Sequence, residues 1–347
     1  MKKQLLIAAV AATMSIAATA DVSITGDSYV SFASRKIGLA NIGVNKNHDS
    51  QGVRLKVVGS TGDTKITAVI RNGSQTRVNE EPKEIDKNRG LHMDSLYVTT
   101  KVGPVNIKAG DYWGTIGLGA RFSSRSKPNS FAASTKIGNW KVGMYTGDGS
   151  NSLGRDNNTN ISTSGKVGPV TIGLVHNPKD FTDITLKGIF RDISVEVERW
   201  IDKTEVKNDT TFVRIGGKVN NFKWDVAQIR NDVVYSAFVE NNDKFTPLGS
   251  MLIGKGARGG TATATVNVGD FTKILGVAVS TKLAGNTVKA IITKNTYGTI
   301  DEVTGTELII SRSVGGATFT ANIAKLSGVE ARNLNAANKG LRLDVKF

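Results

Sequence analysis

The chain has 347 residues, and 45 Lys or Arg against 30 Asp or Glu give a formal net charge of +15 at pH 7. It contains no cysteine, which excludes a disulfide-stapled scaffold, a thiolate metal site and a thiol nucleophile, and it has only three histidines. With 39% hydrophobic and 22% charged residues, the composition is too apolar for a disordered chain.

The first twenty residues have the pattern of a secretory signal peptide. A positive start at Lys2 and Lys3 precedes the apolar run Leu5–Ala17 and the small residues 18–20. A membrane anchor would need about 20 apolar residues, more than this run supplies. We therefore expect residues 1–20 to be removed on export.

Alternating apolar and polar residues, the pattern of half-buried β-strands, recur along the rest of the chain. In the first run Val22 and Ile24 share a face, and in the last Leu341 and Leu343 do so. No segment shows an apolar stripe at helical spacing with caps, so the chain is expected to be all-β. The runs lie at 22–32, 53–57, 64–70, 105–109, 140–144, 170–174, 193–197, 211–215, 262–268, 275–279 and 341–347.

The connections between these runs are of two kinds. Some are short and carry turn residues, as at Gly103-Pro104 and Gly168-Pro169, whereas others are long and polar. Tight turns at one end and long loops at the other are typical of an antiparallel up-and-down β-barrel in an outer membrane. We expect one such domain over residues 21–347. The alternative is a soluble β-sandwich, which the small number of aromatic residues for two interfacial girdles favours.

Both ends of the mature chain and one hairpin resemble the general porins of Gram-negative outer membranes. Asp21–Gly26 follows the signal peptide directly, Leu341–Phe347 is an alternating strand that ends on phenylalanine, and residues 95–110 resemble the hairpin before that family's pore-constricting loop. The resemblance implies a 16-stranded barrel, although the runs allow 18, and a homotrimer that passes small hydrophilic solutes. It also implies that Phe347 is the assembly signal and that a loop at about 111–130 folds inward.

The loop at 111–130 departs from the family's pattern. General porins commonly carry an acidic Pro-Glu-Phe-Gly-Gly-type segment there, whereas this chain holds Arg121, Arg125 and Lys127. We therefore expect a cationic pore constriction at these three residues.

The strand phases give a separate prediction about charge. If the apolar positions face lipid, the alternate positions face the lumen, and basic residues outnumber acidic ones there. Lys and Arg lining a water-filled pore favour anions. The alternative is that these basic groups are merely solvated in the lumen or are counter-charges to acidic lipid headgroups near the rims. The predicted pore-lining residues are Arg54, Lys56, Lys65, Arg71, Lys108, Lys141, Arg214, Lys289 and Arg342; Lys223 and Lys346 share their phase, as do the acids Glu196, Glu198, Asp225 and Asp344.

Signals for other chemistry are weak. Residues 59–65 lack the spacing of a phosphate-binding loop, and no GxSxG or HExxH motif is present. Residues 148–158 are rich in oxygen ligands without the EF-hand pattern, which favours a solvated loop over a calcium site. We expect no enzyme activity, no cofactor, no metal centre and no nucleic-acid partner.

The sequence thus predicts a porin in the outer membrane of a Gram-negative bacterium, a water-filled channel for passive diffusion of small hydrophilic solutes and ions that prefers anions. Its expected partners are further copies of the chain, outer-membrane lipids, and small anionic or neutral solutes. Two alternatives stay open. One is a non-channel barrel that displays its loops for adhesion or as a receptor, and the other is a soluble periplasmic β-protein.

Overall fold

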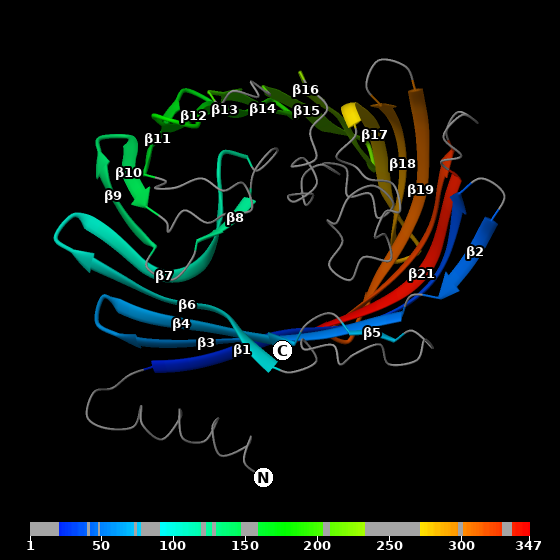
Figure 1. The fold of residues 1–347 in the computed structure, drawn as a ribbon, viewed down its shortest axis with the longest axis horizontal. Coiled ribbons are helices and arrows are strands. Elements are labelled where there is room, and N and C mark those ends of the chain that lie inside the picture. Colours follow the sequence, from blue (N-terminus) through cyan, green and yellow to red (C-terminus); the bar gives the residue numbers. More distant parts are fainter. Residues whose placement is uncertain are drawn as a thin grey trace, which may run out of the picture.

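The computed structural model describes a chain made almost wholly of β-strands (Figure 1). The described residues are 21–39, 42–47, 49–72, 75–77, 91–118, 123–126, 130–146, 159–203, 209–232, 271–297, 301–327 and 335–347. The predicted signal peptide and the run expected at 262–268 lie outside them. No helix in these ranges is long and apolar enough to cross a bilayer.

Eighteen strands close into one antiparallel barrel, because each pairs with the next in the chain and the last pairs with the first. The first nine are β1 (Asp21–Leu39), β3 (Asp49–Thr61), β4 (Thr64–Asn72), β6 (Leu91–Val102), β7 (Val105–Thr115), β9 (Phe131–Ile137), β10 (Trp140–Thr146), β11 (Asn160–Val167) and β12 (Val170–Asn177). The second nine are β13 (Phe181–Phe190), β14 (Ile193–Asp202), β15 (Thr210–Val219), β16 (Phe222–Asn231), β17 (Phe271–Leu283), β18 (Asn286–Tyr297), β19 (Asp301–Val314), β20 (Ala317–Ser327) and β21 (Asn335–Lys346).

Three short strands extend this ring. They are β2 (Ile42–Asn47), paired with β1, β5 (Gln75–Arg77), paired with β3, and β8 (Ser123–Ser126), paired with β7. Figure 1 shows β8 inside the ring of strands, beyond the end of β7.

The all-β barrel expected from the sequence is confirmed, but the preference for 16 strands is wrong. That number came from the family resemblance, and several strands carry little alternation of their own. In β11 the outward series reads Ile161, Thr163, Gly165 and Val167. Barrel strands give a weak signal of this kind when the lipid-facing positions include small or polar residues. They were therefore missed in the count of runs.

Tight turns join the strands at one end of the barrel. Gly62, Gly103, Gly138 and Gly168 sit in these turns with φ of 53°, 57°, 58° and 57°, the left-handed region that glycine enters without steric cost. The chain ends meet at the same end, where Gly26 and Phe347 exchange two backbone hydrogen bonds of 2.7 and 3.0 Å. These bonds extend the β1–β21 pairing that closes the barrel.

The polarity of the barrel is the reverse of a soluble protein's. Large apolar side chains stand exposed on the outward face, for example Ile137 at 65%, Leu341 at 62% and Ile323 at 66%. The inward face instead buries charged groups such as Asp183 and Glu198. In a soluble protein the apolar side chains would line the interior, and exposed apolar surface on this scale would be unusual.

Candidate functional site: the inner wall of the barrel

The predicted pore-lining residues share the inward face of their strands. The cross-strand register puts Asp27 opposite Arg54 and Arg54 opposite Arg71, and it aligns Lys65 with Thr99 and then Lys108. Residues in register across an antiparallel pair point to the same side of the sheet. Lys141, Arg214, Lys289 and Arg342 follow the same phase on their own strands.

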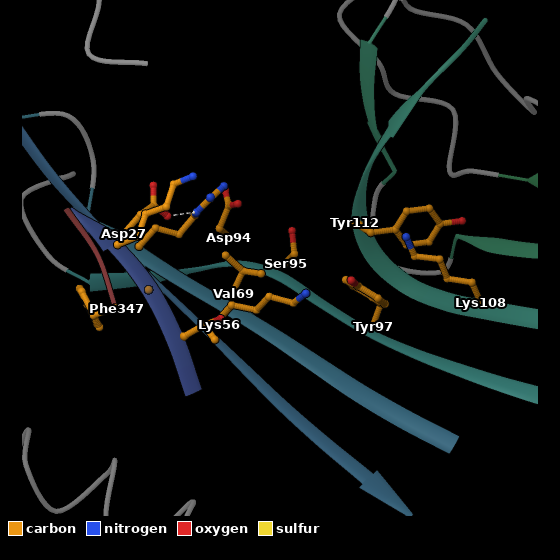
Figure 2. Close-up of a pocket in the computed structure, with 13 residues that line it drawn as sticks. Asp27, Lys56, Val69, Asp94, Ser95, Tyr97, Lys108, Tyr112 and Phe347 are labelled. Carbon is orange, nitrogen blue, oxygen red and sulfur yellow. Dashed lines mark hydrogen bonds and ion pairs between the residues drawn. The ribbon is translucent and has the colours of Figure 1, made fainter. Parts of the chain in front are cut away.

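Part of this wall encloses a cavity of about 760 Å³, lined from β1, β3, β4, β6, β7 and the C-terminus. Figure 2 shows Asp27 near Asp94, Lys108 beside Tyr112 well away from them, and Lys56 between the two groups. Acidic groups therefore share the cavity with the predicted basic ones.

Two of the predicted basic residues are neutralised by ion pairs. Arg54 Nε lies 2.7 Å from Asp27 Oδ1, and Arg71 Nε lies 2.7 Å from Asp94 Oδ1. Neither Asp27 nor Asp94 is among the acids predicted for the inward face. Asp94 was missed because the β4–β6 register shifts between Val69 and Ile70, and such a bulge breaks the strict alternation on which a phase prediction depends.

Lys108 is held by aromatic rings and not by a carboxylate. Its Nζ lies 4.2 Å from the centre of the Tyr97 ring and 3.6 Å from that of Tyr112. The two rings meet edge to face at 5.8 Å. Cation–π contact of this kind stabilises an ammonium group without cancelling its charge. Neither Lys56 nor Lys108 makes an ion pair within the described part of the chain.

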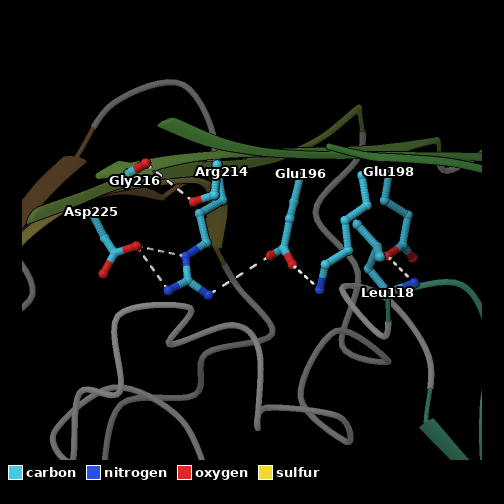
Figure 3. Close-up of polar contacts among 8 residues, drawn as sticks. Leu118, Glu196, Glu198, Arg214, Gly216 and Asp225 are labelled. Carbon is cyan, nitrogen blue, oxygen red and sulfur yellow. Dashed lines mark hydrogen bonds and ion pairs between the residues drawn. The ribbon is translucent and has the colours of Figure 1, made fainter. Parts of the chain in front are cut away.

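On the other side of the barrel the inner wall of β13 to β16 carries a row of alternating charges. Arg214 binds Asp225 through Nη2 at 2.8 Å and lies 3.7 Å from Glu196, which in turn pairs with Lys187 at 2.8 Å. Figure 3 shows Arg214 between the two carboxylates. Such a row presents both signs of charge to a passing ion.

Lys289 and Arg342 differ in their access to the lumen. Arg342 is only 8% exposed; it stacks on the ring of Tyr29 at 4.2 Å and pairs with Asp344. Lys289 is half-buried and lies in register between Ser280 and Ile309. Arg342 is thus committed to packing and to an ion pair.

Exposed lysines gather on the inward face near the tight turns. Lys136 lies directly opposite Lys141, and Lys218 directly opposite Lys223. Like charges placed opposite each other destabilise an antiparallel pair unless water or counter-ions screen them, so this end of the lumen attracts anions. The lysines at this mouth are Lys65, Lys101, Lys136, Lys141, Lys166, Lys218, Lys223, Lys282 and Lys346.

The chain after β7 reaches the inner face of β13 and β14. Ile116 packs in a buried cluster with Phe181 and Trp200, whose rings stack with centres 3.9 Å apart. Leu118 N donates a hydrogen bond of 2.9 Å to Glu198 Oε2. Gly117 turns between them with φ of 60°, against the carboxyl groups of Asp183 and Glu198.

The predicted constriction residues fall largely outside the described part of the chain. Arg121 and Lys127 are not described. Arg125 is described only by its backbone, which lies in β8 and pairs with Trp113 of β7. The candidate calcium segment at 148–158 is likewise not described. No cluster of three or more acidic or histidine side chains suited to a metal ion occurs in the ranges that the structure covers.

No protein-family model matches the chain, and no curated protein matches its sequence. Solved structures do match. OccK3 (OpdO) of Pseudomonas aeruginosa aligns with a TM-score of 0.64 at 9% identity, over 94% of this chain and 96% of that chain. OpdK from Pseudomonas aeruginosa, solved with vanillate, has a TM-score of 0.61 at 10% identity, over 94% of this chain and 98% of that one. OccK2 (OpdF) of Pseudomonas aeruginosa in complex with glucuronate has a TM-score of 0.63 at 8% identity, over 94% of this chain and 98% of that one. The chain therefore has the fold of these outer-membrane channel barrels, whereas membership of the general porins is not shown.

Proposed function

We propose that this chain is a channel of a Gram-negative outer membrane that passes small hydrophilic solutes and ions by diffusion and prefers anions. The chain is then a transport protein and has no enzymatic role. The proposed unit is the single domain at 21–347, exported by the signal peptide at 1–20.

The polarity of the barrel supports a membrane location. A closed ring of strands leaves no unpaired edge, which is one of the two ways in which a backbone can cross lipid. The exposed isoleucines and valines of the outward face would meet acyl chains, and the inward ion pairs would meet water. A soluble periplasmic β-protein would gain nothing from this arrangement.

The observation that carries the anion preference is the set of inward lysines that have no carboxylate partner among the residues the structure describes. Lys56 and Lys108 stand over the cavity, and the lysines at the mouth repeat from strand to strand. Cationic side chains that line a narrow aqueous path raise the local concentration of anions and lower that of cations. The ion pairs at Arg54, Arg71, Arg214 and Arg342 reduce this excess without reversing it.

The comparisons support the same class of solute. Vanillate and glucuronate, the molecules named with OpdK and OccK2, are both small carboxylate anions. We propose small carboxylates as the first solutes to test. The homotrimer, the cationic constriction at Arg121, Arg125 and Lys127, and the role of Phe347 in assembly stay predictions.

Single-channel recording of the refolded mature protein in a planar bilayer tests the proposal. We expect discrete conductance steps and, under a KCl gradient, a reversal potential on the chloride side. Steps with a potassium-side potential would keep the channel and reject the anion preference. Correctly folded protein that inserts without conductance would reject the channel and favour a barrel that displays its loops for adhesion or as a receptor.

A further inference from the structure

The outward face of the barrel carries a second set of cations that the proposed channel does not use. They lie toward the loop end of β14, β16, β17, β18, β20 and β21, six of the eight strands in the arc of the wall from β14 to β21 (Figure 1). The six residues are Arg199, Arg230, Lys273, Lys294, Lys325 and Lys339.

The centre of this set is a like-charged pair. Arg230 and Lys273 lie directly opposite each other on β16 and β17, and both are exposed. Like charges in this position destabilise an antiparallel pair, so an anion bound between or above the two side chains would stabilise the arrangement. No described acid pairs with either of them.

The acids nearby are directed elsewhere. Asp209 accepts a hydrogen bond from Arg199 Nη2, and Asp232 lies 3.9 Å from the same nitrogen, so both acids form ion pairs with Arg199. In the cross-strand register Lys273 on β17 lies opposite Thr296 on β18, and Thr296 lies opposite Glu302 on β19, so Glu302 is two strands away from Lys273. Within the described part of the chain, no carboxylate therefore neutralises Arg230 or Lys273.

The height of the pair on the barrel points to an interface. Below Lys273 the outward residues of β17 are Leu275, Val277 and Val279, and the strand ends at Leu283. Ten residues at roughly 3.3 Å each, tilted by about 40°, span roughly 25 Å, the height of the apolar band of an outer-membrane barrel. Lys273 thus lies at the upper edge of the band, where lipid headgroups begin.

The opposite arc lacks these charges. The outward, exposed residues toward the loop end of β6, β9, β10 and β11 are apolar, so the cations do not simply follow the rim. These residues are Leu91, Met93, Phe131, Met144 and Ile161.

We propose that Arg230 and Lys273, with the neighbouring outward cations, bind the phosphate groups of a phosphate-bearing lipid headgroup in the leaflet on the loop side. Arg and Lys side chains at the edge of an apolar band supply both the charge and the donors that phosphate oxygens accept. Acyl chains of the same lipid would lie against Leu275 and Val277 below. The inference rests on the proposed membrane location, but not on conduction or anion preference.

Native mass spectrometry of the detergent-solubilised mature protein, titrated with diphosphoryl lipid A, tests the site. We expect lipid A to be retained, and fully dephosphorylated lipid A to bind about tenfold more weakly or worse. Arg230→Gln/Lys273→Gln should lose affinity by a similar factor, whereas Arg230→Lys should keep it. The matched control is Arg312→Gln, which removes an outward cation at the tight-turn end and should bind as the wild type does.

Heat-modifiable gel migration and single-channel conductance of the same variants show whether the barrel is intact. Equal retention of lipid A by the wild type and by the folded double variant would overturn the proposal. Displacement of lipid A by millimolar inorganic phosphate would assign a free-phosphate site instead and would also overturn it. Wild-type protein that is correctly folded and retains lipid A but gives no conductance would reject the proposed channel alone.

Discussion

The backbone N–H of Leu118 donates a hydrogen bond of 2.9 Å to Glu198 Oε2, although 80 residues of chain separate the two. This bond fastens the segment after β7 to the inner face of β14. It lies beside the buried cluster of Ile116, Phe181 and Trp200, so one polar and one apolar contact hold the same three loop residues. The position of the inward segment therefore depends on both.

The acceptor at Glu198 can be tested with two variants that both remove its charge. Glu198→Gln keeps a carbonyl oxygen for Leu118 N–H, whereas Glu198→Ala leaves that donor without a partner. Both variants remove the charge beside Asp183, so the difference between them reports the hydrogen bond to Leu118 together with the buried side-chain volume and the contact with Asp183 that only the Ala variant loses. We expect the Ala variant to be less stable by about 1–3 kcal/mol. Guanidinium unfolding of the protein in lipid vesicles measures this difference in stability. Equal unfolding midpoints for the two variants would contradict the role of Glu198 as acceptor for Leu118 N–H.

Gly117 is expected to tolerate no side chain. Its φ of 60° alone costs a substituted residue about 1–2 kcal/mol, and an added Cβ would overlap Asp183 Oδ2. Gly138 is the matched control, since its φ is 58° but no atom lies within 4 Å of an added Cβ. Gly117→Ala should therefore lower the free energy of unfolding more than Gly138→Ala and increase open-channel noise. Equal effects would show that the contact with Asp183 does not restrict the site.

Arg214 and Asp225 should shift ion selectivity in opposite directions. Arg214→Gln leaves Glu196 and Asp225 without their shared cation, which favours potassium, whereas Asp225→Asn leaves Arg214 less neutralised, which favours chloride. A unit charge at about 10 Å in water is worth roughly 0.4 kcal/mol, or about a twofold change in the local concentration of each ion. Reversal potentials in dilute KCl measure both shifts. A common direction for the two variants would exclude a lumen role for the pair.

The preference for chloride is expected to weaken with salt. The Debye length falls from about 10 Å at 0.1 M to about 3 Å at 1 M, so concentrated KCl screens the inward lysines from ions on the pore axis. The permeability ratio of chloride to potassium should be largest in dilute KCl and approach the ratio of the bulk mobilities in concentrated KCl. Neutralising Lys56 and Lys108 to Gln should flatten this dependence. A ratio independent of salt would point to steric selection.

Phe347 covers Gly26, and the two should be coupled in assembly. An added Cβ at Gly26 would lie 2.5 Å from two ring atoms of Phe347, while the backbone bonds between the two residues would remain. We expect Gly26→Ala to slow folding into vesicles in the wild type and to have little further effect in Phe347→Ala. The rate at which the heat-modifiable band appears measures this. Additive effects would show that the ring contact plays no part.

Much of the fold could be predicted from the sequence, because a two-residue period is a local property of the chain. The alternation of Arg54 and Lys56 with Leu55 and Val57 identified a strand and its two faces. The strand number could not be found in this way, since the outward series of strands such as β11 is interrupted by polar or small residues, here Thr163 and Gly165. The inward acid Asp94 was missed for a different reason, the bulge between β4 and β6.

The sequence by itself determined the β-class, the phase of the well-patterned strands and the excess of basic over acidic residues, all of which depend on residue identity and near neighbours. Only the tertiary structure decided which charges cancel. Arg54 with Asp27, Arg214 with Asp225 and Leu118 with Glu198 are contacts between strands or between loop and wall. Coulomb and hydrogen-bond energies depend on distances of a few ångströms, which only closure of the barrel fixes.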